Sequence, residues 1–332
     1  MSEFTPQGQV AGIGSLPHKD PDEAVRFVAE RCPTIPFWPQ LPKRAPAEMM
    51  VAQVLAPLRV ALEKRNSARF DVKKGALTSF RHRLAETEPY LETEGSAGFF
   101  AFEKACEANV FTQANALKGQ MVGPITLAHC LFANGRALVS WPELHAGITD
   151  YLCRLGVWQI QRLQRFGKPV LFFVDEPVLG LGTSSASLLN SLRQLINTLK
   201  TTGAQIGIHC CASQIPPVIY TLQPNIISFD AYQQLESFLA SPQTHAYVGD
   251  GGCVALGLIP TLTHPGDVDP LATWMRWLTA AQGEYDLDRL ARQSLITATC
   301  GLGLLTVKTA QAVFEKCHEL SKLIVTAREF AD

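Results

Sequence analysis

Short apolar runs alternate with longer amphipathic stretches along the chain. Each run is rich in Val, Ile, Leu or Phe and ends at a Gly, a Pro or a polar residue, which is typical of parallel strands buried on both faces. Eight such runs predict strands over Gln9–Gly14, Thr34–Trp38, Lys118–Val122, Pro169–Val174, Gln205–His209, Asn225–Phe229, Gly252–Leu258 and Ser294–Thr299.

Helical periodicity fills the intervals between these runs. It predicts helices over Pro21–Arg31, Ala47–Lys64, Phe99–Ala116, Pro142–Phe166, Ala186–Thr201, Asp267–Ala281 and Thr306–Arg328. Eight alternating units predict one α/β domain over residues 1–332, a single (β/α)8 TIM barrel with an insertion around residues 41–116. A doubly wound open sheet is the rival fold. The segment Gly12-Ile13-Gly14-Ser15-Leu16-Pro17 lacks the spacing of that fold's phosphate-binding glycines.

The composition is that of an ordinary globular protein. Of 332 residues, 47% are hydrophobic and 18% charged, and the net charge of -1 gives no reason to expect a nucleic-acid partner. No apolar run is long enough for a membrane span and Met1–Gln7 is polar, so we expect a cytoplasmic protein with no membrane partner. The nine cysteines, an odd number without regular spacing, are expected to be reduced.

Polar side chains follow the predicted strands, where a barrel carries its active site. His209, Cys211 and Cys300 are soft or borderline metal ligands and Asp230 adds a carboxylate, a set that suits tetrahedral zinc. Side chains two apart on a strand point the same way, so His209 and Cys211 can face one metal ion while Cys210 faces away. The alternative is that these cysteines only pack in the core, as we expect for Cys32, Cys106, Cys130, Cys153, Cys253 and Cys317.

Several motifs together resemble the catalytic domain of cobalamin-independent methionine synthase, within the superfamily that includes uroporphyrinogen decarboxylase. In chain order they are Ile13-Gly14-Ser15-Leu16-Pro17, Gly123-Pro124-Ile125-Thr126, Asp175-Glu176-Pro177, His209-Cys210-Cys211 and Cys300-Gly301-Leu302. Each is short, but their order and spread over most of the chain make the likeness specific. It implies a zinc-dependent methyltransferase that methylates the thiol of homocysteine to form methionine.

The resemblance assigns roles to individual residues. It places the zinc ligands at His209, Cys211, Cys300 and Asp230, the last standing where the family has a glutamate. It implies that Ile13, Gly14, Ser15 and Asp175 hold the amino-acid part of homocysteine, with Glu48 a further candidate for its ammonium group. His264 is the nearest match to the family's proton-donating histidine and is the predicted catalytic residue, although it is shifted by several positions.

Thiol chemistry explains why such a site needs a metal. A free thiol has a pKa near 8.5, and the thiolate is the form that attacks. A catalytic zinc keeps a position at which a substrate sulfur can bind and ionise.

The neighbouring carboxylates Asp175 and Glu176 allow another interpretation, a glycosidase pair. Side chains one apart on a strand diverge, so the two cannot both face one glycosidic bond. We therefore expect Asp175 to bind an ammonium group and Glu176 to make hydrogen bonds inside the domain.

The methyl-donor side departs from the family. His129 and Cys130 stand where the family has the Trp that stacks on folate, and Leu181 stands where it has a Glu for the pterin. These losses favour a methylcorrinoid protein over methyltetrahydrofolate as the donor.

Two other functions stay open from the sequence. One is a corrinoid-dependent methyltransferase or a uroporphyrinogen decarboxylase-like barrel that acts on another thiol or substrate. The other is a non-catalytic metal-binding barrel.

Overall fold

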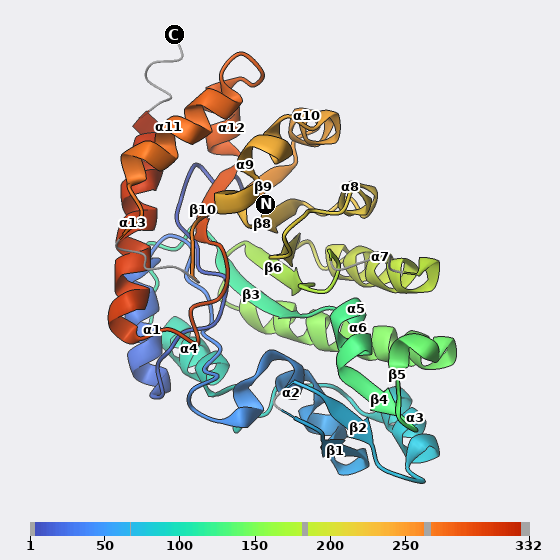
Figure 1. Cartoon of the computed structure of the whole chain (residues 1–332). Helices are drawn as coiled ribbons and strands as arrows, with labels where there is room; N and C mark the ends of the chain where they lie inside the picture. Colours follow the sequence, from blue (N-terminus) through green and yellow to red (C-terminus); the bar gives the residue numbers. More distant parts are fainter. Residues whose placement is uncertain (1–3, 67, 181–184, 262–266, 327–332) are drawn as a thin grey trace.

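The computed structural model describes residues 4–66, 68–180, 185–261 and 267–326. Its centre is a curled sheet of six parallel strands in the order β10-β9-β8-β7-β6-β3 (Figure 1). The strands are β3 (Leu117–Val122), β6 (Val170–Asp175), β7 (Gln205–Cys210), β8 (Ile226–Phe229), β9 (Cys253–Ile259) and β10 (Ser294–Ala298). Nearly every residue in them is buried, which explains why the runs read as continuous rather than alternating apolar sequence.

The sheet buries both of its faces. A small apolar cluster joins Leu171 and Phe173 of β6 to Leu295 of β10 and to Ala11 and Ile35 near the N-terminus. Residues from strands so far apart in the sheet can meet only inside its curl, so this cluster marks the concave face. The larger cluster lies between the convex face and the helices.

Most of the long helices agree with the prediction. They are α1 (Pro21–Arg31), α6 (Pro142–Gln164), α7 (Ala186–Lys200), α11 (Pro270–Ala281) and α13 (Val307–Thr326). The helix expected over Phe99–Ala116 is wrong in extent, because α4 (Ala97–Glu107) ends nine residues earlier. The helix expected over Ala47–Lys64 is wrong in extent, because only α2 (Met50–Leu55) is α-helical before Pro57 and a 3-10 turn end it. None of the helices in the described ranges combines the length and the apolar character needed to cross a bilayer.

Shorter elements were not predicted. Six are short helices: α3 (Leu77–Glu86), α5 (Pro124–Cys130), α8 (Val218–Thr221), α9 (Ala231–Leu239), α10 (Pro242–Gly249) and α12 (Leu287–Arg292). A separate mixed sheet has the order β1-β2-β4-β5 and lies beside α2 and α3 (Figure 1). Its strands are Leu62–Lys64, Phe70–Val72, Leu131–Ala133 and Arg136–Ala137, too short to show a periodic pattern.

The predicted closed eight-stranded (β/α)8 barrel is wrong. Six of the eight expected strands are present, but the runs over 9–14 and 34–38 are not strands. They make isolated parallel bridges, Val10 with Ile296 and Phe37 with Lys118, and a few backbone hydrogen bonds to β10 and β3. Just beyond the two runs, Ser15 bridges Gln40. Pro36 and Pro39 have no N–H to donate, so a continuous hydrogen-bond ladder cannot run along the second segment.

Glu176 is used inside the fold, as expected. It follows β6 and is fully buried at the start of α5. One carboxylate oxygen accepts a hydrogen bond from Ile125 N at 2.8 Å, and the other accepts from Thr126 N at 2.8 Å and Thr126 Oγ1 at 2.6 Å. Gly123 leaves room for it, because a Cβ there would lie 2.2 Å from Glu176 Oε1. Burial raises the pKa of Glu176 to about 7 despite these donors.

We expect Glu176→Ala to lower the free energy of unfolding by about 3 kcal/mol, because three buried donors lose their acceptor. Denaturant unfolding measures this, with Glu88→Ala at an exposed position as the control. A loss below about 1 kcal/mol would mean that the cap of α5 is not important for stability.

Candidate metal centre

Three potential ligands meet at the carboxyl ends of β7 and β10. The ligand atoms of His209, Cys211 and Cys300 all lie within 4.8 Å of one another. His209 is the penultimate residue of β7, and Cys211 directly follows that strand. Cys300 comes just after β10. This group could hold a metal ion, which agrees in part with the predicted site.

The imidazole of His209 has one nitrogen in use and one free. Nδ1 shares a hydrogen bond with Ser228 Oγ on the neighbouring strand β8 at 2.9 Å. Nε2 is buried and has no hydrogen-bond partner among the residues that the structure describes. A buried polar atom without a partner is costly, and a metal ion would satisfy it. Hydrogen bonding of the other ring nitrogen is the usual way to orient a ligating histidine.

The two thiols are electrostatically coupled. Their Sγ atoms lie 3.8 Å apart and share a hydrogen bond. That bond, helped by His209 and by the backbone N–H of Gly301, lowers the pKa of Cys300 to about 4 although burial opposes it. The same bond, together with burial, raises the pKa of Cys211 well above its usual range. A divalent cation could take the place of the thiol protons here, because cysteine binds metal ions as the thiolate.

Ser15 fixes the position of the Cys300 loop. Its carbonyl oxygen accepts a hydrogen bond from Leu302 N at 2.9 Å, and its Oγ accepts one from Gly303 N at 3.1 Å. The approach is so close that a Cβ on Gly301 would lie 2.2 Å from Ser15 Oγ. The structure thus brings the predicted Ile13-Gly14-Ser15 segment next to Cys300.

Asp175 places a carboxylate beside this cluster. It ends β6, and its partner in the strand register is His209. The residue is 6% exposed, and its Oδ1 is buried without a hydrogen-bond partner in the described part of the chain. Burial raises its pKa to about 6, while the electrostatic interactions with His209 and Lys118 act in the opposite direction. An unpaired buried carboxylate oxygen suits a cationic substrate group.

Asp230 is not brought into the ligand group. Its Oδ1 accepts a hydrogen bond from Gln233 N at 3.0 Å and its Oδ2 one from Gln233 Nε2 at 2.7 Å, so the carboxylate caps α9. Aspartate is a preferred N-cap residue, and α9 begins directly after it. Its expected role as a fourth ligand stays a prediction.

The carboxylate of Glu48 is also hydrogen-bonded within the protein. It is fully buried, and its carboxylate accepts hydrogen bonds from Ala97 N at 3.0 Å, from Arg44 at 3.1 Å and from Gln53 at 3.4 Å. Burial raises its pKa. Gln53 in turn accepts from Gln40 Nε2 at 2.8 Å, which connects Glu48 with the Ser15 bridge but not directly with the thiols.

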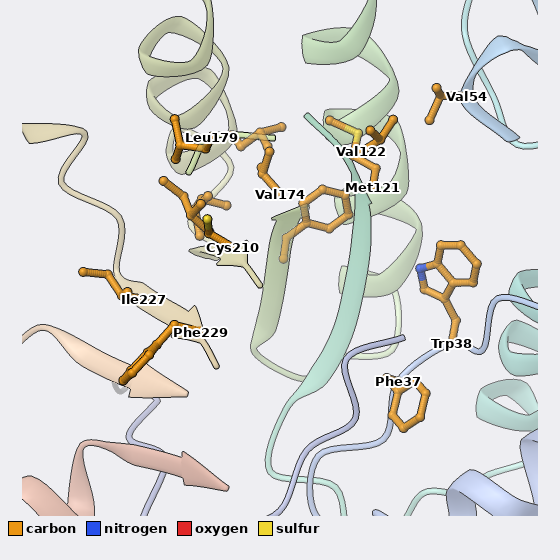
Figure 2. Packing of buried hydrophobic residues seen from close by; sticks show 14 of the residues in the cluster. Phe37, Trp38, Val54, Met121, Val122, Val174, Leu179, Cys210, Ile227 and Phe229 are labelled. Atoms are coloured by element: carbon orange, nitrogen blue, oxygen red, sulfur yellow. The ribbon is translucent and has the colours of Figure 1, made fainter. Parts of the chain in front are cut away.

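Two predicted positions cannot be placed. His264, the predicted catalytic residue, and Leu181, the altered pterin position, lie outside the described residues. Cys210 faces away from the ligands as expected, in the same buried apolar cluster as Val174 and Leu179 (Figure 2). Ser228 and Lys118 were missed, because a serine or a lysine inside an apolar run carries no signal of its partners.

Comparison with protein-family models and with curated proteins gave no match to this chain. The function must therefore be argued from the site itself. Two thiols and one imidazole, with no fourth protein donor among the described residues of the group, would leave a bound metal ion one position for another ligand.

We expect the protein to bind about one Co²⁺ per chain, giving thiolate-to-cobalt absorption bands that can be titrated. Cys211→Ser or Cys300→Ser should weaken binding by a factor on the order of a hundred or more, because each removes one of the three ligands. Cys210→Ala is the matched control and should bind normally, since its sulfur lies in the core. Full cobalt binding by Cys300→Ser would contradict the assignment.

Proposed function

We propose that the chain is a zinc-dependent methyltransferase that transfers a methyl group to the thiol of homocysteine and so forms methionine. One observation carries the proposal. The cluster of His209, Cys211 and Cys300 lies beside a buried carboxylate oxygen of Asp175 that has no partner in the described structure. A thiol-binding metal site next to an ammonium-binding carboxylate fits an amino-acid thiol better than a simple one.

The donor set favours zinc. Thiolate and imidazole together are typical zinc ligands, and catalytic zinc sites use three protein donors where structural sites use four. When bound, the ion would lower the pKa of a substrate thiol from its usual value near 8.5 and present it as thiolate. Because Asp230 is engaged as a helix cap, three donors remain, which argues against a closed structural site and a purely non-catalytic role.

The protein's own residues would position the substrate. Asp175 would accept hydrogen bonds from the ammonium group, and the Ile13–Ser15 segment would border the amino-acid end, because Ser15 is bonded to the loop of Cys300. In the reaction the bond from donor to methyl breaks, the bond from sulfur to methyl forms, and the thiol proton has left on binding.

Homocysteine should change the absorption bands of the cobalt-loaded protein, because its sulfur adds a thiolate ligand. Asp175→Asn should weaken homocysteine binding by about tenfold or more, since a charged hydrogen bond is worth roughly 1.5–3 kcal/mol. Propanethiol, which has no amino group, is the control and should bind both proteins alike. An unchanged spectrum at saturating homocysteine would contradict the proposed acceptor.

For the donor we propose a methylcorrinoid protein rather than methyltetrahydrofolate. In the structure Cys130 is the last residue of α5 and is only partly buried, so a stacking aromatic ring is absent from this position. The side chain of Leu181 has no donor or acceptor and cannot make a hydrogen bond to a pterin. The loss of stacking and of a buried hydrogen bond corresponds to an affinity loss on the order of a hundredfold or more.

Methionine formation from homocysteine should therefore be efficient with methylcobalamin and poor with methyltetrahydrofolate polyglutamate. The two donors are compared in separate assays with the zinc-loaded protein, and Cys300→Ser is the inactive control. Efficient turnover with the folate would show that the donor inference from Cys130 and Leu181 is wrong.

A further inference from the structure

A buried lysine lies inside the curl of the sheet. Lys118 is the second residue of β3 and is only 2% exposed. Burying an ammonium group is expensive unless it is paired and hydrogen-bonded, so its contacts need an explanation.

The side chain of Lys118 is held by three groups. Its Nζ donates to the carbonyl oxygen of Ile13 at 2.6 Å and to Gln120 Oε1 at 3.1 Å, and it lies 4.7 Å from the centre of the Phe173 ring. The charge of Asp175 also stabilises the ammonium. These contacts offset the loss of hydration.

The side chains of Lys118 and Gln120 add to the short backbone pairing of the two N-terminal segments. The segments over 9–14 and 34–38 each make one isolated bridge and a few backbone hydrogen bonds to the sheet, the first to β10 and the second to β3. Gln120 Nε2 donates to the carbonyl oxygen of Trp38 at 3.0 Å, while Lys118 holds the carbonyl oxygen of Ile13. Two side chains of β3 therefore tie both segments to this strand, in addition to the few backbone hydrogen bonds.

The bond from Lys118 leads to the site by a short path. Ile13 is two residues before Ser15, and Ser15 holds the backbone of Leu302 and Gly303 in the loop that carries Cys300. Lys118 makes no hydrogen bond to the ligand side chains in the described part of the chain, and His209 has its own support from Ser228.

We propose that Lys118 is a positioning residue for the amino-acid end of the substrate, which it fixes by holding the Ile13–Ser15 segment against the metal centre. This inference rests on the proposed function. A residue that only filled space against Phe173 would need no ammonium group, because a methionine of similar length would fill it at lower cost. The expected defect is therefore in recognition of the amino acid and not in metal or thiol binding.

The test compares Lys118→Met with the wild type, both loaded with Co²⁺. We expect unchanged cobalt stoichiometry, propanethiol binding within about twofold, and homocysteine binding weaker by about tenfold or more. Lys200→Met is the matched control, because Lys200 also donates to a carbonyl oxygen, that of Gln223, but at the end of α7. That variant should bind both thiols as the wild type does.

Each other outcome has a definite meaning. Equal losses for both thiols, or unchanged homocysteine binding, would overturn the role of Lys118. If Lys118→Met does not fold, Ser15→Ala removes a later bond of the same path and must show the same selective loss for the inference to stand. If the wild type shows no spectral change with either thiol, the proposed function itself fails.

Discussion

The structure depends on one contact, the pair of hydrogen bonds by which Ser15 holds the loop after β10. The contact joins residues 288 positions apart in the chain, and it requires Gly301 because any side chain there would collide with Ser15 Oγ. It determines where Cys300 lies relative to Cys211. The six-stranded sheet alone would place β10 at one edge and β3 at the other, and the segment carrying Ser15 spans the interval between them.

The site differs from its surroundings in which polar atoms remain unused. Glu176, Glu48 and Asp230 are buried carboxylates, but each is saturated by helix N–H groups or side chains. Asp175 and His209 occupy paired positions on adjacent strands, and each keeps one buried atom without a partner among the described residues. Because unsatisfied buried groups are costly, they mark where a ligand contributes most.

The metal centre and the polar interior have different physical origins. The ligands come from chain segments just beyond strand ends, where the backbone leaves the ladder and side chains can converge. The interior lysine is tolerated because irregular segments present free carbonyl groups to it. The departure from a regular barrel is thus also what provides acceptors for a buried cation near the site.

The sequence alone determined the elements whose signal is local. Long apolar runs and helical periodicity located six strands and most long helices, and the spacing of His209 and Cys211 placed both ligands on one side of β7 with Cys210 in the core. Tertiary structure decided what depends on distant partners. Apolar runs over 9–14 and 34–38 resemble strands, yet each makes only an isolated bridge and a few backbone hydrogen bonds to the sheet among the described residues. The cap that Asp230 forms on α9 was likewise not predicted from the sequence. Whether a polar atom is free or already bonded is a property of the folded neighbourhood, and periodicity carries no information about it.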